Sequence, residues 1–231
     1  MANILIIGCS TGIGSALSNL LIAQGHKVFG TYYSSLSSQA LFAKVQELNV
    51  LDEALDISFA PDKLDGLVYC PGDVKLKPFV RVKPSDFISD YQLQVVGAVK
   101  VIQACLPKLK NAADPSIVLF SPVAVQTGFN FHSLVAASKG AVEGLTKALA
   151  AEFAPKIRIN CIAPSVTEAP MAADAAGNEE KVDLDVKRHH LKKIAKSEDL
   201  ANLAEFLLSD KSSWITGQII HAGGGISSLK L

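Results

Sequence analysis

The stretch that decides the fold lies at the start of the chain, where residues 3–21 read NILIIGCSTGIGSALSNLL. Its first part, Asn3–Ile7, is a short apolar run of the kind that forms a buried parallel strand. Its last part, residues 15–21, has the apolar spacing of a helix. Three of the seven residues between them are glycines, which predicts a tight turn that joins the strand to the helix.

This glycine turn, residues 8–14, has the properties of an anion site. Glycine lets backbone N–H groups approach a ligand closely, and the first turn of the next helix adds unpaired N–H groups and the positive end of its dipole. A strand, this turn and a helix in that order predict dinucleotide binding. The alternative is a turn that only packs a helix on a sheet. The predicted pyrophosphate contacts are Gly8, Ser10, Thr11, Gly12, Ile13 and Gly14.

Length and charge narrow the class of protein. The 231 residues suit one α/β domain over residues 1–231. Lys plus Arg and Asp plus Glu number 22 each, and the zero net charge argues against a nucleic-acid partner, because phosphate binding needs clustered positive charge. The one basic cluster, residues 187–193, follows several acidic residues and is interpreted as a solvated or hinge segment.

Hydropathy and cysteine usage point to a cytoplasmic protein. No apolar run approaches 18 residues and the chain begins directly with a strand, so we expect no transmembrane helix, no membrane partner and no signal peptide. The four cysteines are scattered through apolar segments without metal or redox spacing. Reduced thiols and no metal site are therefore expected.

Strand-length and helix-length apolar segments alternate along the chain. This order predicts an α/β fold, a Rossmann-type doubly wound parallel sheet of about seven strands with helices on both faces. After the first strand, the others are expected at residues 26–31, 47–50, 64–70, 116–120, 157–162 and 217–221. Further helices are expected at residues 37–45, 86–109 and 134–153, and a last one that opens with Ser197 as its N-cap.

The segment between residues 164 and 191 has no strong periodicity and holds clusters of Ala, Asp, Gly and Asn. In a doubly wound sheet it would follow the carboxyl end of a strand, where ligands bind. Two interpretations stay open: a lid over the ligand, or a surface loop with a short helix.

Six ordered motifs make the chain resemble the short-chain dehydrogenase/reductase family over essentially its whole length. They are the glycine turn, the strand end at residues 64–72, the segment AASKGAV at 136–142, the segment RINCIAP at 158–164, SEDLA at 197–201, and WITGQ at 214–218 with two glycines after it. The resemblance implies the fold predicted above. It also implies hydride transfer with NAD or NADP, in which a tyrosine, a lysine and a serine carry out acid/base chemistry.

The chain departs from this family at the proton-transfer positions. The lysine is Lys139, but Val135 stands in place of the tyrosine and Pro122 in place of the serine. Valine has no ionisable group, and proline has neither a hydroxyl nor an N–H. The family's asparagine corresponds to Gln94, and the threonine that contacts the nicotinamide carboxamide corresponds to Ala169.

Two interpretations follow from these replacements. The chain is an NAD(P)-dependent oxidoreductase with another proton donor, or a non-catalytic NADP(H)-binding sensor, scaffold or partner subunit. Four nearby residues can donate a proton, and each also has a structural interpretation. Ser121 would point to the opposite face of its strand, His132 would cap or pack, Ser133 would be a helix N-cap, and Tyr69 would pack at a strand end.

The resemblance also places the remaining cofactor contacts. No acidic residue follows the second strand, where one would bind the ribose 2′-hydroxyl of NAD, so NADP is favoured over NAD. No Arg or Lys stands there to bind a 2′-phosphate either. The residues implied are Thr31, Tyr32, Asn49, Val50, Cys70, Pro71, Gly72, Pro164 and Thr167, with Lys139 holding the ribose.

The two long helices, near residues 86–109 and 134–154, carry apolar residues on more than one face. Members of the family associate through these helices, so a homodimer or homotetramer is expected. The alternative is that both helices are fully buried within one subunit. The substrate, a small molecule if the protein is active, is not indicated by the sequence.

Overall fold

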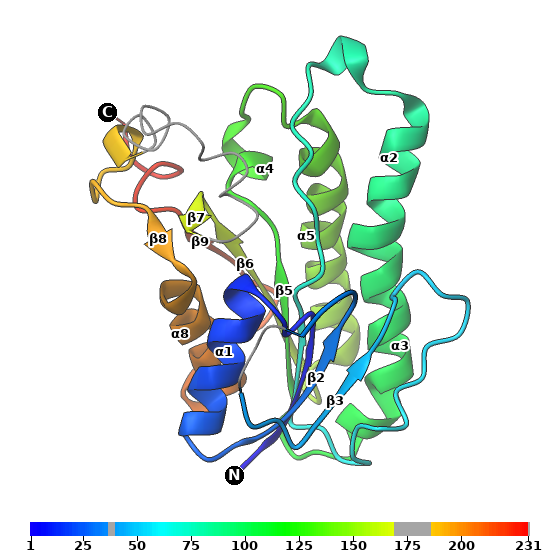
Figure 1. Cartoon of the computed structure of the whole chain (residues 1–231). Helices are drawn as coiled ribbons and strands as arrows, with labels where there is room; N and C mark the ends of the chain where they lie inside the picture. The colour runs from blue at the N-terminus through cyan, green and yellow to red at the C-terminus, as the bar shows by residue number, and fades with distance from the viewer. Residues whose placement is uncertain (37–39, 169–185, 231) are drawn as a thin grey trace.

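The computed structural model describes residues 1–36, 40–168 and 186–230. Its centre is a sheet of seven parallel strands in the order β3-β2-β1-β4-β5-β6-β9 (Figure 1). The strands are β1 (Asn3–Ile7), β2 (Lys27–Tyr32), β3 (Lys44–Glu47), β4 (Gly66–Tyr69), β5 (Ser116–Phe120), β6 (Arg158–Pro164) and β9 (Ile219–Ala222). The predicted parallel sheet is confirmed.

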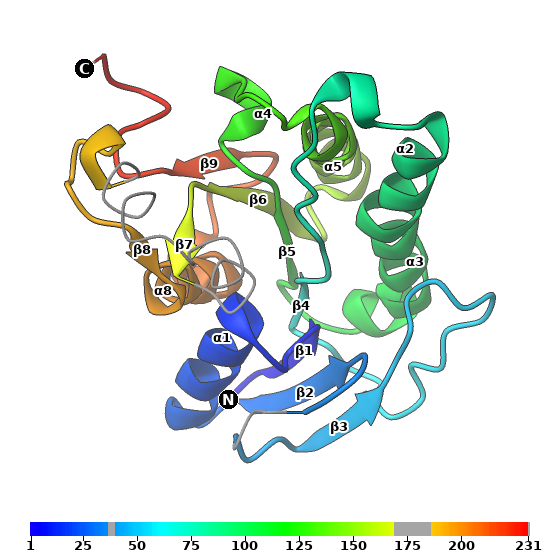
Figure 2. The ribbon, with the colours of Figure 1, turned by 45° about the horizontal axis from the view of Figure 1, so that its top comes forward.

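Helices cover both faces of this sheet (Figure 2). One face carries α1 (Gly12–Ala23) and α8 (Ser197–Leu208), and the other carries α2 (Pro84–Tyr91), α3 (Gly97–Lys110) and α5 (Ser133–Phe153). Strand β1 shows why: Ile4 and Ile6 belong to one buried apolar cluster, whereas Leu5 and Ile7 belong to the other. Because alternate residues of a strand face opposite sides, an all-apolar strand requires a layer on each side.

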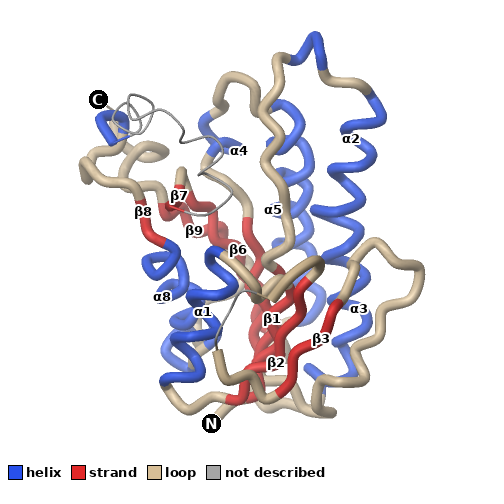
Figure 3. Tube along the Cα trace, in the orientation of Figure 1, coloured by secondary structure: helices blue, strands red, loops and turns tan. Residues whose placement is uncertain are grey.

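The strand order reverses beside β1, which pairs with β2 on one side and with β4 on the other. At such a reversal the following loops diverge to opposite faces and leave a crevice at the carboxyl ends of the strands. The glycine turn follows β1 directly, so the fold places it at this point. Figure 3 traces the strands in red and the loops that join them to the helices in tan.

The prediction for residues 37–50 was wrong in part. The helix expected at residues 37–45 falls partly on residues 37–39, outside the described residues, and its remainder is not helical. Strand β3 begins at Lys44, three residues before the predicted start, because Lys44–Glu47 pair with Phe29–Tyr32 of β2. The backbone N–H of Leu51 then donates to Asn49 Oδ1 at 3.1 Å, in a turn that follows the strand.

The long helix predicted at residues 86–109 runs from α2 through a π-helical turn, Gln92–Val96, into α3. The π-helical turn was not predicted. The N-cap of α8 was also wrong: Lys196 occupies the cap position, and its N–H donates to Asp199 Oδ2 at 2.9 Å. The Ser197 hydroxyl instead donates to the carbonyl of Glu168 at 3.2 Å.

Smaller elements complete the described chain. A two-stranded sheet joins β7 (Thr167–Glu168) to β8 (Ala195–Lys196), and α4 (Ala124–Thr127) follows β5. Short 3-10 turns span Phe79–Arg81 and Asp210–Ser212. Among the helices that the structure describes, none is long and apolar enough to cross a membrane.

Candidate cofactor and proton-transfer site

The glycine turn after β1 adopts a conformation that only glycine allows without strain. Gly8 and Gly12 have φ angles of +78° and +53°. Gly14 has a different role: a Cβ atom there would lie 2.1 Å from the carbonyl oxygen of Gly8. The three glycines therefore let the start of α1 pack against the end of β1.

The amino end of α1 has the features of an anion site. Thr11 occupies the N-cap, its side chain makes no capping hydrogen bond, and the first turn contains no acidic residue. The helix dipole and the unpaired N–H groups of this turn are therefore not neutralised by the chain's own carboxylates. Together with the close approach of the backbone at Gly8 and Gly14, this fits the pyrophosphate of a dinucleotide.

Thr31 supports the turn from the neighbouring strand. Its carbonyl accepts the N–H groups of Gly8 and Cys9 at 3.1 and 2.8 Å, and its hydroxyl oxygen accepts the Gly8 N–H at 3.2 Å. The side chain is 1% exposed. Thr31, predicted as a cofactor contact, is thus placed behind the turn and holds its backbone.

Three further predicted cofactor contacts lie at the end of β2 and just after β3. Tyr32 ends β2 and is half-buried. Asn49 uses its side chain locally, since its amide donates to Asp52 Oδ1 at 2.8 Å. Val50 is buried, and a Cβ atom on Gly97 would lie 3.1 Å from its Cγ2.

The segment 70–72 connects the glycine turn to Lys139. A Cβ atom on Gly8 would lie 3.3 Å from the nitrogen of Pro71 and 3.5 Å from the Cβ of Cys70. A Cβ atom on Gly72 would lie 3.4 Å from Lys139 Nζ. A continuous line of contacts therefore runs at the carboxyl ends of β1 and β4, from the glycine turn through segment 70–72 to Lys139.

Lys139 lies in α5, where its ammonium group is desolvated and has polar side chains as neighbours. Burial lowers the pKa of Lys139 to about 8, and the neighbouring groups Cys161, Asp90 and Cys70 act in the opposite direction. At neutral pH the side chain is a cation that has lost much of its hydration. Such a cation binds hydroxyl and anionic groups strongly.

Two buried polar atoms face the same region without partners within the described chain. They are Gln94 Oε1 and Asp90 Oδ2. The Gln94 amide donates to the carbonyl of Asp73 at 2.8 Å, and a Cβ atom on Gly72 would lie 2.9 Å from Gln94 Oε1. Buried polar atoms are normally satisfied, so these two mark a place where a polar group can bind.

The two positions at which the sequence predicts replacement of the family's tyrosine and serine are apolar in the structure. Val135 is 1% exposed at the amino end of α5, one turn before Lys139. Pro122 directly follows Ser121 at the end of β5. Neither side chain can give or accept a proton.

Two of the proposed substitute donors are engaged elsewhere. The Ser121 hydroxyl donates to Glu143 Oε1 at 2.8 Å, and both side chains are buried. The Tyr69 hydroxyl donates to the carbonyl of Leu93 at 2.7 Å, and burial raises the pKa of Tyr69 well above its usual range. The interpretations of Ser121 as pointing away and of Tyr69 as packing fit these contacts.

The other two candidates lie at the start of α5. His132 is in the N-cap position without a side-chain cap, its Nδ1 lies 2.8 Å from the carbonyl oxygen of Asn130, and its ring packs edge-on against Phe129. The packing interpretation of His132 therefore fits. Ser133 is the first residue of the helix and not its N-cap, so that expectation was wrong, and its buried hydroxyl has no partner among the described residues.

A serine–histidine pair was missed by the sequence analysis. Ser165 Oγ lies 2.9 Å from His189 Nε2, and His189 is 3% exposed. Ser165 follows Pro164, the predicted nicotinamide-side residue, and Thr167 donates to its carbonyl at 3.1 Å. The two residues are 24 positions apart, and neither stands in a motif that would have predicted their contact. Ala169 lies outside the described residues.

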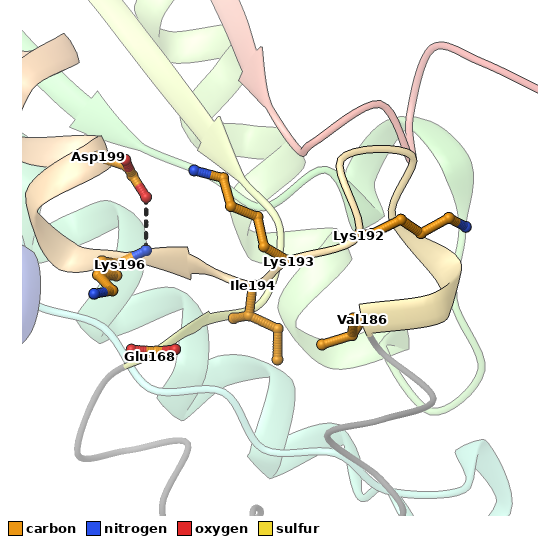
Figure 4. Close-up of a pocket in the computed structure, with 7 residues that line it drawn as sticks. All are labelled: Glu168, Val186, Lys192, Lys193, Ile194, Lys196 and Asp199. Carbon is orange, nitrogen blue, oxygen red and sulfur yellow. Dashed lines mark hydrogen bonds between the residues drawn. The ribbon is translucent and has the colours of Figure 1, made fainter.

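A hollow of about 490 Å³ is lined by the seven residues drawn in Figure 4. Its charged residues are Lys192, Lys193, Lys196, Glu168 and Asp199, together with the apolar Val186 and Ile194. The basic cluster predicted as a solvated or hinge segment therefore contributes two lysines to a concave surface. A second cavity of about 230 Å³ shares Lys193 and Asp199 and also contains Ser165 and His189.

Comparison with known proteins finds related reductases over nearly the whole chain. Residues 8–227 match a family model described as Enoyl-(Acyl carrier protein) reductase. The 3-oxoacyl-(acyl carrier protein) reductase of Thermotoga maritima is 31% identical over 241 residues, which covers 96% of each chain.

Solved structures share the whole fold. The aldohexose dehydrogenase of Thermoplasma acidophilum superposes with a TM-score of 0.91 at 23% identity, over 99% of this chain and 95% of that chain. The structure of ElxO with NADP bound has a TM-score of 0.88 at 25% identity, over 99% of this chain and 100% of that chain.

Proposed function

The chain belongs to the short-chain dehydrogenase/reductase family of NAD(P)-dependent oxidoreductases, and from this premise we propose that it transfers a hydride between NADP(H) and a carbonyl or alcohol substrate. The supporting observation is the continuous line from the glycine turn through residues 70–72 to Lys139. The proposed reaction reduces a carbonyl to an alcohol or reverses that step. The bound nicotinamide would supply or accept the hydride.

The proposed cofactor contacts follow that line. The glycine turn would hold the pyrophosphate and Lys139, the one retained catalytic residue, would hold the ribose through its desolvated ammonium. The full set is Gly8, Ser10, Thr11, Gly12, Ile13, Gly14, Thr31, Tyr32, Asn49, Val50, Cys70, Pro71, Gly72, Lys139, Pro164 and Thr167. Thr31 acts in this set by fixing the turn.

NADP is proposed over NAD because of the residues at the end of β2 and directly after it. Tyr32, Tyr33 and Ser34 offer hydroxyl groups and no carboxylate. A carboxylate there would repel a 2′-phosphate and bind the free ribose of NAD. ElxO, a structural relative at 25% identity, is a protein whose structure contains NADP.

A catalytic role is proposed over a purely cofactor-binding one. The relatives reported above are reductases and dehydrogenases by name, and none favours a non-catalytic sensor or scaffold. The proton donor in this chain would differ from the family's tyrosine and serine, since Val135 and Pro122 occupy those positions. The substrate pocket would lie at the carboxyl ends of β5 and β6.

Assembly and location belong to the same proposal. We propose one domain over residues 1–231 and a homodimer or homotetramer formed through the outer faces of α2, α3 and α5. Ile88 and Tyr91 on α2 are 63% and 45% exposed, which leaves apolar surface for a second subunit. Four free cysteines fit the reducing cytoplasm.

The test is a calorimetric titration followed by turnover. NADPH and NADH are titrated separately into the wild-type chain, and NADPH oxidation is then followed with ethyl acetoacetate, acetophenone and benzaldehyde as carbonyl probes. Binding of NADPH with turnover of a carbonyl supports the proposal. Failure to bind either nucleotide would contradict it.

A further inference from the structure

We propose that Ser165 and His189 form the proton-transfer pair of this protein, with Ser165 as the group that hydrogen-bonds and protonates the substrate oxygen. The inference rests on the proposed function, because it concerns the same hydride-transfer site. The hydroxyl that the family carries at position 122 would here come from the neighbouring strand end. Nothing in the family resemblance assigns a role to either residue.

The first support is the position of Ser165 relative to Pro122. The parallel ladder between β5 and β6 continues past β5, with Ser121 N–H donating to the carbonyl of Ile162 and Val123 N–H donating to that of Pro164, both at 2.9 Å. Pro122 is therefore flanked on the next strand by the residues immediately before Ser165. The carboxyl ends of β5 and β6 therefore lie side by side at one end of the sheet.

The second support is the geometry of the pair itself. Ser165 Oγ and His189 Nε2 are 2.9 Å apart, within hydrogen-bond range for a hydroxyl and an imidazole. Ser165 is half-buried, whereas the histidine is 3% exposed. A half-buried hydroxyl in contact with a buried imidazole suits proton delivery to a ligand.

The third support is the space left for the imidazole by the glycines after β9. Gly224 has a φ of +56°, and a Cβ atom there would lie 3.2 Å from His189 Cδ2. A Cβ atom on Gly223 would lie 3.0 Å from Val123 Cγ1. Gly224 thus leaves room for the His189 ring, and the preceding residue, Gly223, packs beside Val123, which follows Pro122.

A cavity gives the pair a place for a ligand. Its volume is about 230 Å³, and its walls include Ser165, Val166, His189, Leu191, Leu200 and Gly223. The titratable groups that share these walls with His189 are Lys193 and Asp199, one of each sign. Asp199 Oδ2 accepts the backbone N–H of Lys196 at 2.9 Å. His190, the residue after His189, has its Nε2 3.0 Å from the carbonyl oxygen of Lys230.

In the reducing direction, the substrate oxygen takes its proton from Ser165. The carbonyl carbon of the substrate gains a hydride, with its two electrons, from the reduced nicotinamide. The C=O π bond breaks, and its electron pair forms an O–H bond with the proton of Ser165 Oγ. Ser165 Oγ takes a proton from His189 Nε2, and the neutral imidazole regains one from water. Oxidation of an alcohol runs through the same atoms in reverse.

The pair is tested with Ser165→Ala, His189→Gln, the conservative Ser165→Thr and the control His221→Gln, an exposed histidine of β9. Loss of a positioned proton donor lowers kcat by about 100-fold. We expect that loss in Ser165→Ala and His189→Gln, recovery in Ser165→Thr, and no change in His221→Gln. The Kd for NADPH should stay within about twofold in all four, because the pair acts on the substrate oxygen.

A pH profile separates proton transfer from a structural role. Reduction consumes a proton that passes through His189, so kcat of the wild type should depend on pH. This pH dependence should disappear in His189→Gln. Thermal melting of each variant shows whether the fold is kept, and Ser165→Thr retains the hydroxyl if Ser165→Ala proves unstable.

A measurement without turnover covers the case in which no carbonyl probe reacts. The ring-nitrogen NMR signal of His189 should move when NADP⁺ binds, because a cationic nicotinamide next to the pair polarises it, while that of His221 stays unchanged. The proposed role of the pair would be overturned if the His189 signal does not move. It would also be overturned if the variants turn over at the wild-type rate with the wild-type pH profile. In both cases, binding of NADPH would still support the proposed function. Absence of binding to both nucleotides would instead defeat the proposed function, and the pair with it.

Discussion

The two ends of the proposed cofactor site are built on different principles. At the pyrophosphate end, three glycines and the amino end of α1 present backbone groups, and the geometry depends on the absence of side chains. At the nicotinamide end, the chemistry depends on particular side chains, and the sequence predicts that Pro122 and Val135 replace two that the family uses. Binding and proton transfer are therefore separable, and each end can be perturbed without the other.

The largest effect is expected from Gly14→Ala at the pyrophosphate end. Its Cβ atom would lie 2.1 Å from the Gly8 carbonyl oxygen, so the backbone must move. Overpacking of this kind lowers the free energy of unfolding by about 3 kcal/mol. NADPH binding should fall below detection by calorimetry.

Gly144→Ala is the matched control for that substitution. Gly144 lies in α5 with nothing within 4 Å of the added Cβ, so a helix interior should gain about 0.5–1 kcal/mol. Equal stability and equal NADPH affinity in the two variants would show that the close approach at Gly14 is not needed.

Lys139→Met is expected to have the next largest effect. It removes a desolvated cation while keeping most of the side-chain volume, and hydrogen bonds to charged groups contribute about 1.5–3 kcal/mol. The Kd for NADPH should rise about 10- to 100-fold, measured by calorimetry at pH 7. An unchanged Kd would mean that Lys139 does not contact the cofactor.

Tyr32→Asp tests the adenosine side of the same end. A carboxylate after β2 repels a 2′-phosphate and binds a free ribose hydroxyl, so the ratio of the NADPH and NADH affinities should shift by about tenfold toward NADH. If the variant still binds NADPH more tightly than NADH by the wild-type ratio, the proposed position of the 2′-phosphate is wrong.

The pH dependence of cofactor binding is a smaller effect. Because burial lowers the pKa of Lys139 to about 8, its charge is present below that pH and is lost as pH rises through it. The Kd for NADPH should therefore increase by a few-fold, about 1 kcal/mol, between pH 7 and 9. In Asp90→Asn the increase should begin at lower pH, because the Asp90 carboxylate raises the pKa of Lys139.

The smallest effect on cofactor binding is expected from Val135→Tyr combined with Pro122→Ser. Both residues lie at the nicotinamide end, so the Kd for NADPH should stay within about twofold while the carbonyl reduction rate rises. Val135 is 1% exposed, and a tyrosine there would cost about 1–3 kcal/mol in overpacking. A folded variant that binds NADPH but gains no activity would show that the substrate pocket differs as well.

The same contrast explains how much the sequence predicted. Asn3–Ile7 was placed to the residue and the glycine turn was recognised, because local spacing determines both. Strand β3 was misplaced, since its bounds follow from pairing with β2 and not from its own weakly apolar sequence.

The side-chain groups of the nicotinamide end were harder to predict. Asp90 and Lys139 belong to different helices, and Ser165 meets His189 only through the folding of the chain after β6. No spacing in the sequence records such contacts. The resemblance to the family predicted the replacements at Pro122 and Val135. It did not predict Ser165 and His189, the groups that we propose in their place.

The calorimetric titration of NADPH and NADH into the wild-type chain is the decisive experiment for the proposed cofactor site. We predict that NADPH binds at one site per chain and binds more tightly than NADH. An absence of binding heat for both nucleotides, in protein shown to be folded by its thermal transition, would contradict it.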